Sequence, residues 1–347
     1  MYRKLTIALI IIVLISAFPM CAFANTSFNR PFPIPSDLSG MDIEGLIDPP
    51  SPFVWQNSFM SDITWTAREE GLEMQVTIPE LTEEYGPARF TVNNEIERVV
   101  EVRISAAKEA KARSIVFDYE VYYTDTMISI IILSTVTSFS SREEVMSVNF
   151  EPQSGRLIPI SEALGVDITP LAAKYLMEKI RLNPERFKAD FNVLTGDTAF
   201  YLTESRLNLL FDELKLSTMA DGITRISLEL ERIRSITVSR EDYVIQPGGY
   251  NLKMMPLALI CDGLGYHYSW FNYDRRVTVR RGDTVIELYP AENNYLVHGR
   301  KQRTLEAAPV ILNNRIYVPI SFFDQILSLT TFAMDEDENI IFLTYLE

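Results

Sequence analysis

Two stretches of the sequence, MMPLALICDGLGYHYSW at residues 254–270 and YVPISFFDQILSLTTFA at residues 317–333, repeat one pattern. A constant offset of 63 residues aligns them without a gap, pairing Pro256 with Pro319, Leu264 with Leu327 and Val277 with Ile340. Each copy predicts a proline, one short amphipathic helix and then a β-hairpin. One copy is too small to bury its own apolar face, so we expect the two to face each other in one compact domain.

This duplicated module is predicted to occupy residues 250–347. Pro247, Gly248 and Gly249 precede it and mark a boundary. Between the two copies, residues 284–288 and 295–302 have the composition of strands. The C-terminal third is therefore expected to be a small α+β domain.

The preceding residues, 63–246, predict a second α+β domain. Alternating apolar residues at 72–78 indicate a strand that stops at Pro79, and helical spacing of apolar residues predicts a long helix over 88–113. Consecutive strands, rich in β-branched and aromatic residues, are expected at 114–123, 127–137 and 144–150. The fold class is thus α+β, with an antiparallel sheet packed by one long helix.

The rest of this domain carries further start and stop signals. Pro170 in the first turn predicts a second helix from Thr169 to about Leu182. Strands follow at 199–202, 207–211 and 223–230. The apolar run 127–136 is too short to span a membrane, so it is interpreted as a strand buried on both faces.

SVNFEPQSGRLIPISEAL, residues 147–164, resembles the DUF3298 signature of a strand, then x-x-x-G-[KR]-L, then a short helix. The helix at 88–113 and the strands after it resemble the DUF4163 segment that precedes this signature, and AFYLTESRLNLLFDE at 199–213 continues the match. The resemblance covers roughly residues 63–245. It implies the extracytoplasmic domain of RsiV-type anti-sigma factors and PdaC-type peptidoglycan deacetylases.

The chain departs from that family at LKLSTMADG, residues 214–222, where the family has a Tyr-rich, Pro-containing loop followed by Ala-Gly. We take this segment as the candidate ligand-binding loop. Its candidate contacts are Leu214, Lys215, Thr218, Met219 and Asp221. RsiV-type domains bind lysozyme, so the resemblance implies a basic extracellular protein as one class of partner.

The duplicated module resembles the copper amine oxidase N-terminal-like domain, which is common at the ends of secreted envelope proteins of Firmicutes. The matching residues are the M-P-L…L-G-Y…W of 255–270 and the A-P-V-I-L-N-N-R-I-Y-V-P-I of 308–320. The resemblance covers residues 250–342 and implies association with peptidoglycan or another wall polymer.

Copper chemistry does not follow from this resemblance. In copper amine oxidases, a tyrosine in Asn-Tyr-Asp/Glu becomes a quinone beside a copper held by three histidines. The chain contains that tripeptide at 272–274 but only two histidines, His267 and His298, so a three-imidazole site cannot form. The offset of 63 maps the tripeptide onto residues 335–337, and both are predicted to be polar turns.

The acidic run at 335–339 has oxygen ligands suited to calcium but lacks the glycine and the spacing of a known calcium loop. It is therefore read as a solvated turn. The sequence contains no Gly-x-Ser-x-Gly, no His-Glu-x-x-His and no phosphate-binding glycine loop. We expect a protein that is not an enzyme and needs neither metal nor cofactor.

The first 24 residues predict a secretion signal. Basic Arg3 and Lys4 precede an apolar run at 5–18, and the small residues Ala22 and Ala24 follow. Cleavage is predicted after Ala24. The alternatives are an uncleaved anchor, for which the run is short, and a lipoprotein cysteine at Cys21, which bulky residues precede.

Processing after Ala24 leaves Cys261 as the only thiol, so no intramolecular disulfide is expected. Residues 25–62 carry repeated prolines and predict an extended tether. The formal charge is −15, and loss of Arg3 and Lys4 changes it to −15 − 2 = −17. Such an acidic surface disfavours nucleic acid and suits a basic protein partner.

The sequence thus predicts a secreted, non-catalytic cell-envelope protein that binds a wall component or an extracellular protein. Two other roles stay open. One is an accessory of a wall-modifying hydrolase or deacetylase, suggested by the proteins in which these domains occur. The other is a purely structural envelope component.

Overall fold

The computed structural model describes residues 59–188, 194–218, 220, 222–246, 252–327 and 330–346. The predicted signal, most of the tether and the 247–249 boundary lie outside these residues. Helices and several separate sheets confirm the predicted α+β class. Within the described residues, no helix is both long enough and apolar enough to cross a membrane.

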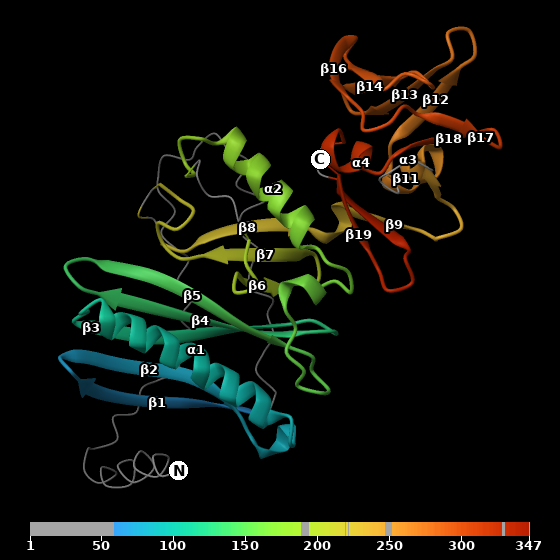
Figure 1. The fold of residues 1–347 in the computed structure, drawn as a ribbon. Helices are drawn as coiled ribbons and strands as arrows, with labels where there is room; N and C mark the ends of the chain where they lie inside the picture. The colour runs from blue at the N-terminus through green and yellow to red at the C-terminus, as the bar shows by residue number, and fades with distance from the viewer. Residues whose placement is uncertain are drawn as a thin grey trace, which may run out of the picture. The chain divides into compact units, whose positions relative to one another are not determined.

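The first sheet has five strands in sequential order, and one helix covers one of its faces (Figure 1). Its elements are β1 (Met60–Glu69), β2 (Leu72–Leu81), α1 (Arg89–Glu109), β3 (Ser114–Tyr123), β4 (Ile128–Thr137) and β5 (Ser141–Phe150). All neighbours are antiparallel except β2 and β3, which are parallel. The parallel pair arises because α1 crosses over between them, as parallel strands require.

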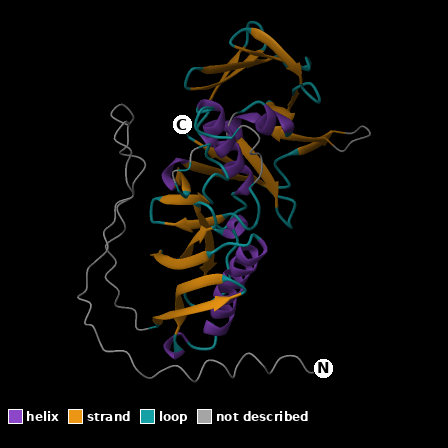
Figure 2. Ribbon diagram, turned by 90° about the vertical axis from the view of Figure 1, so that its left-hand side faces the viewer, coloured by secondary structure: helices purple, strands orange, loops and turns teal. Residues whose placement is uncertain are grey.

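Residues at helical spacing on α1 form a core with the residues of the sheet that point to the same side. Val92 and Ile96 of α1 are buried there against Val76 of β2 and Ile130 of β4. The view in Figure 2 shows α1 as a layer beside these strands. Strand β4 is buried along most of its length, as the sequence predicts.

A second, smaller sheet covers the other face of β4 and β5. It consists of β6 (Ala199–Leu202), β7 (Arg206–Phe211) and β8 (Thr224–Glu229). Ile131 and Val145 of the first sheet pack against Tyr201 and Leu210 of the second. Helix α2 (Thr169–Leu182), with Pro170 in its first turn, packs on the opposite face of β6–β8. The local order of layers is α1, first sheet, second sheet, α2.

Two predicted element ends are wrong by a few residues. Strand β2 continues past Pro79 to Leu81, because β3 pairs only with residues 73–76 and no donor is required from Pro79 on that side. Helix α1 ends at Glu109 instead of near Arg113. Lys111 adopts a positive φ of 52°, and the backbone N–H of Arg113 bonds to Thr137.

Three short 3-10 helices connect these elements: η2 (Glu83–Tyr85), η3 (Ile160–Glu162) and η4 (Leu230–Arg232). The remaining elements are β9 (Ile233–Val238), β10 (Val244–Gln246), β11 (Leu252–Pro256), α3 (Leu257–Leu264), β12 (His267–Phe271), β13 (Arg276–Arg281), β14 (Thr284–Leu288), β15 (Asn294–Val297), β16 (Arg300–Thr304), β17 (Val310–Leu312), β18 (Arg315–Pro319), α4 (Ser321–Gln325), β19 (Thr330–Met334) and β20 (Ile340–Tyr345).

The same order of elements occurs twice in the C-terminal part of the chain. In the first copy, β11, α3 and the β12–β13 hairpin follow one another, and in the second copy β18, α4 and the β19–β20 hairpin do the same. Strands β12 and β19 begin at residues 267 and 330, which differ by 63. Helices α3 and α4 contribute to one shared core. The stretch expected as one strand at 295–302 is instead β15 and β16, separated by a turn at His298 and Gly299.

Strand β9 belongs to the core of this C-terminal part although it precedes the duplicated residues. It pairs antiparallel with β20, and Val238 is buried in the shared core. Helix α3 approaches β9 so closely that a Cβ atom at Gly263 would lie 2.9 Å from Cβ of Ile236. Only glycine fits at that contact without a shift of the neighbouring chain.

Candidate functional site

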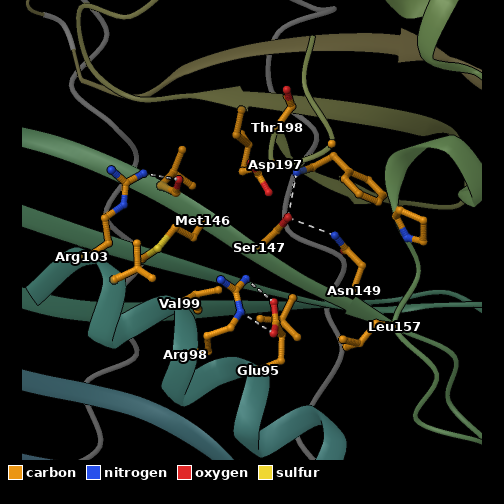
Figure 3. A pocket seen from close by; sticks show the side chains of 18 of the residues that line it. Glu95, Arg98, Val99, Arg103, Met146, Ser147, Asn149, Leu157, Asp197 and Thr198 are labelled. Atoms are coloured by element: carbon orange, nitrogen blue, oxygen red, sulfur yellow. Dashed lines mark hydrogen bonds and ion pairs between the residues drawn. The ribbon is translucent and has the colours of Figure 1, made fainter. Parts of the chain in front are cut away.

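A cavity of about 440 Å³ lies at the free edge of β5. Helix α1 forms one wall, the residues leading into β6 form another, and the end of β7 closes one side. Figure 3 shows Ser147 of β5 among side chains of these elements. The volume lies within the range of roughly 300–1,000 Å³ that is usual for ligand sites. We refer to it as the β5 pocket.

The edge of β5 is closed by other groups on both sides of Ser147. At one side, the N–H of Val145 donates to Oδ1 of Asp212 (2.8 Å), and its carbonyl accepts from Arg103 (3.3 Å). At the other side, the carbonyl of Asn149 accepts from the N–H of Ile158 (2.8 Å). Both main-chain groups of Val145 and the carbonyl of Asn149 are therefore occupied, whereas the N–H of Asn149 has no partner among the described residues.

Ser147 lies two residues from Val145 and two from Asn149. Because the main-chain groups of every second residue in a strand point to the same side, its N–H and C=O also point to the free edge of β5. No partner for either group comes from beyond that edge in the part of the chain that the structure describes. The Ser147 side chain is occupied: its Oγ accepts from the N–H of Phe200 (3.1 Å) and from Nδ2 of Asn149 (3.0 Å). The pocket is thus faced by the unpaired N–H and C=O of Ser147.

A partly buried ion cluster forms one end of the pocket. Arg103 of α1 donates to Glu144 (3.0 Å) and to both carboxylate oxygens of Asp212 (3.2 Å each). The Glu144 side chain is only 5% exposed, and Arg142 also contacts it. These contacts tie α1, β5 and the end of β7 together, so the cluster holds the pocket wall in place.

The charges that line the pocket balance one another. Arg98 binds both carboxylate oxygens of Glu95, and this hydrogen bonding, with a smaller contribution from the charge of Asp197, raises the pKa of Arg98. Asp197 and Lys215 lie at the rim and are exposed. The lining residues comprise three cations, Arg98, Arg103 and Lys215, and three anions, Glu95, Asp197 and Asp212.

The candidate loop of the sequence analysis contributes one residue to this pocket, Lys215. Leu214 is partly exposed and has a positive φ of 61°. The Thr218 hydroxyl donates to the carbonyls of Glu185 (2.9 Å) and Arg186 (3.0 Å) and so fastens the loop. Met219 and Asp221 lie outside the described residues.

Sequence reasoning missed Ser147, Asn149 and Arg103. A signal was present, because SVNF places Ser147 and Asn149 at alternate positions, separated and followed by the apolar Val148 and Phe150. Asn149 is 5% exposed, and its Oδ1 has no hydrogen-bond partner. Polar residues on a buried strand face are informative in this way, since such groups normally have a partner.

The residues around the Asn-Tyr-Asp tripeptide do not fit a copper and quinone centre. Tyr273 is fully exposed, Asn272 accepts from the indole of Trp270 (2.5 Å), and Asp274 pairs with Arg276. All three lie in the turn between β12 and β13, as predicted. His298 lies in a separate turn with a φ of 49°.

The acidic run 335–339 is a turn that is held by hydrogen bonds among its own residues. The carboxylate of Asp335 accepts from the backbone N–H groups of Asp337 (3.0 Å) and Asn339 (2.8 Å) and from Nδ2 of Asn339 (3.0 Å). The Asn339 side chain is the largest of the causes that lower the pKa of Asp335. Among the described residues, no group of three or more His, Cys, Asp or Glu side chains has a metal-binding arrangement.

A sequence model of the copper amine oxidase N-terminal domain matches residues 244–343. The C-terminal module has the predicted family resemblance. The match begins at the first residue of β10 and ends within β20, so it leaves out β9, which pairs with β20.

Three other proteins are similar to parts of the chain. A protein named "Protease inhibitor" from Brevibacillus choshinensis is 24% identical over 125 residues, which are 35% of this chain and 38% of that protein. The match thus spans well under half of that relative.

The other two are solved structures of DUF3298 family proteins, and each is 13% identical to the chain. The one from Bacteroides fragilis covers 50% of this chain and 89% of its own (TM-score 0.32). The one from Pseudomonas aeruginosa covers 54% and 94% (TM-score 0.35). DUF3298 is also the family that residues 63–245 resemble in sequence. No residue roles are transferred from these structures.

Proposed function

We propose that this chain is an exported, non-catalytic binding protein of the cell envelope, and that its ligand occupies the β5 pocket. The observation that carries this proposal is the unpaired N–H and C=O of Ser147, which face a cavity of about 440 Å³ between the occupied main-chain groups of Val145 and the occupied carbonyl of Asn149. Unpaired main-chain groups at a concave site favour a ligand that can complete their hydrogen bonds.

The side chains of the pocket favour a ligand-binding site over a catalytic site. A serine nucleophile needs a base that accepts its proton, whereas Oγ of Ser147 accepts from two N–H donors. The Asp212 carboxylate is held by Arg103 and by the N–H of Val145, and Glu95 is held by Arg98. These acidic groups therefore serve to stabilise the wall of the pocket.

The proposed location and partners rest on the sequence. The predicted signal at residues 1–24 would export the chain, and the resulting charge of −17 suits a basic extracellular protein such as lysozyme. The copper amine oxidase N-terminal-like module supports association with peptidoglycan or another wall polymer. The relative named as a protease inhibitor favours a role in binding proteins.

The proposal is tested with purified protein lacking residues 1–24. We would measure its retention on peptidoglycan, and on immobilised lysozyme over a series of salt concentrations. A Gly196→Trp variant fills the pocket, because Gly196 lines it and has open space beside it. Thr66→Trp is the matched control, since Thr66 is exposed on β1, at the opposite edge of the first sheet.

We expect the unmodified protein and Thr66→Trp to be retained equally on at least one of the two materials, and Gly196→Trp to be retained at least tenfold less. If the unmodified protein is retained by neither, the proposed function is wrong. If Gly196→Trp is retained as well as the control, the ligand binds outside the β5 pocket. Release of soluble products from the peptidoglycan would instead favour a hydrolase or its accessory.

A further inference from the structure

We infer that the β5 pocket binds an extended peptide segment of a partner protein, which adds to the first sheet as a short strand beside Ser147. This inference rests on the proposed function and specifies the class of ligand. In an antiparallel pair, a residue opposite Ser147 would exchange two hydrogen bonds with it, one through each main-chain group.

The closed stretches of the edge set the length of the segment. Asp212 and Arg103 occupy the main-chain groups of Val145, and Ile158 occupies the carbonyl of Asn149. Residues 145 and 149 are four positions apart, which corresponds to about 13 Å at roughly 3.3 Å per residue. The opening therefore admits about three residues of a strand, so the partner offers a short extended segment instead of a whole sheet edge.

The edge is closed by side chains of Asp212 and Arg103 on one side of Ser147 and by the main chain of Ile158 on the other, so the opening at Ser147 is local. Further along β5, Glu213 accepts from the N–H of Glu143 (2.9 Å) and donates its own N–H to the Glu143 carbonyl (2.8 Å). Blocking groups of this kind normally protect an edge strand from pairing with other chains. Ser147 is the position at which this protection is interrupted.

The charges of the site favour a neutral main chain over a charged group. The three cations and three anions of the lining cancel, and two of the cations are already paired with acidic groups. Neither an isolated phosphate nor an isolated ammonium group finds an excess of opposite charge there. Amide groups, which carry one donor and one acceptor, match the open groups of Ser147.

Asn149 is a second, independent indication of a ligand. Its side chain is 5% exposed and lines the pocket, and its Oδ1 lacks a hydrogen-bond partner. A buried acceptor without a partner is destabilising, so an N–H group brought by a ligand would offset that cost. A peptide carries such donors at every second position along its edge.

The test begins with a library of random hexapeptides displayed on phage, selected on the protein without residues 1–24. The best peptide is then synthesised with N-methyl groups at each position in turn. An added strand predicts that one N-methyl group lowers affinity at least tenfold, while alanine at the same position changes affinity less than threefold. Uniform small effects, or failure to select any peptide, would overturn the inference.

Two variants of Ser147 test the same point from the protein side. Ser147→Pro removes the outward N–H, and proline is tolerated at edge strands when that N–H faces outward. Ser147→Ala removes the hydroxyl and keeps the N–H. We expect at least a tenfold loss of peptide affinity for Ser147→Pro relative to Ser147→Ala. Equal affinity would contradict the inference, and should Ser147→Pro fail to fold, the N-methyl series decides.

A competition experiment distinguishes this inference from the proposed function. An oligosaccharide of N-acetylglucosamine also carries amide groups, and it is added as a competitor at millimolar concentration. Displacement of the peptide by the sugar would replace the peptide assignment with a glycan. Retention on peptidoglycan or lysozyme that no selected peptide reduces would leave the proposed function standing and refute only the added strand.

Discussion

Met255 of β11 and Val318 of β18 lie directly opposite each other in an antiparallel pair, and they are equivalent residues of the two repeats. On either side, Met254 faces Pro319 and Pro256 faces Tyr317. Exchanging the two repeats therefore maps this pair of strands onto itself. A local two-fold axis passes between Met255 and Val318, and the repeats face each other across it.

This symmetry explains the position of β9. In the first repeat, Val277 of β13 pairs with Leu288 of β14. The equivalent residue in the second repeat, Ile340 of β20, pairs with Val238 of β9. Leu288 and Val238 are both fully buried. Strand β9 thus takes in the second repeat the place that β14 takes in the first.

The contact between β9 and α3 leads to a prediction about Gly263. Alanine in a helix is normally favoured over glycine by about 1 kcal/mol, but a Cβ atom at Gly263 would lie 2.9 Å from Cβ of Ile236. We expect Gly263→Ala to lower the free energy of unfolding by about 1–3 kcal/mol, as overpacking does. Urea denaturation measures it, with Gly196→Ala as the control, because nothing lies within 4 Å of that Cβ position. A stabilised Gly263→Ala would contradict the close packing.

The ion cluster beside the pocket predicts a large effect of removing Arg103. Arg103→Met leaves Glu144 and Asp212 without their shared cation, and the Glu144 side chain is 5% exposed. Removing one partner of a buried pair costs about 3–5 kcal/mol, and partial exposure of Arg103 reduces this to about 2–4 kcal/mol.

Arg68→Met is the matched control, because Arg68 and Glu73 form an exposed pair with side chains 71% and 65% exposed. We expect a change within about 0.5 kcal/mol there. The free energy of unfolding in urea compares the two variants, and similar losses would show that the cluster does not stabilise the fold.

Alkaline pH is predicted to destabilise the fold through Tyr345. Burial, with a smaller effect from Tyr175, raises the pKa of Tyr345 to about 12, above its ordinary value of 10.0. Between pH 10 and 12 the unfolded chain loses this proton while the folded chain keeps it, so stability is full below pH 10 and falls as pH rises. The loss from this residue is at most about 3 kcal/mol.

Tyr345→Phe removes that ionisation and should flatten the decline of unfolding free energy from pH 10 to 12. Tyr273→Phe serves as the comparison, since Tyr273 is fully exposed. The two variants would be compared by urea denaturation at a series of pH values. Parallel pH profiles for the two variants would argue against the raised pKa of Tyr345.

Cys261 is predicted to be unreactive until the chain unfolds. Its thiol is fully buried in the core of the C-terminal module, and burial raises its pKa. We expect no iodoacetamide adduct on the native protein exported from cells and one adduct in urea, as measured by mass spectrometry, if the predicted cleavage takes place. Two adducts in urea would show that Cys21 is retained, which would contradict cleavage after Ala24.

Strong local patterns predicted much of the fold. The repeat with its offset of 63 predicted both hairpins of the C-terminal module, and Pro170 marked the start of α2. The apolar run at 127–136 predicted a strand buried on both faces. These features follow from side-chain period and from proline stereochemistry, which act within a few residues.

The candidate site was predicted only in part. Of the residues proposed in the 214–222 loop, Lys215 alone among the described ones lines the pocket. The other lining residues come from α1, β5, residues 157–159, the residues leading into β6 and the end of β7. Its decisive residue, Ser147, looks like any polar residue of a strand. Its open N–H matters only because Asp212, from the end of β7, and Ile158, from the segment after β5, close the edge on either side.

The sequence by itself determined the duplication, the kinds of element and the faces they bury, because these depend on local period and composition. Tertiary structure decided that β9 completes the second repeat and that the edge of β5 stays open beside Ser147. Strand pairing depends on which edge is free when distant segments meet, and a main-chain edge carries no side-chain code for its partner. The order of residues therefore predicts the strands, and the assembled sheets decide what those strands can bind.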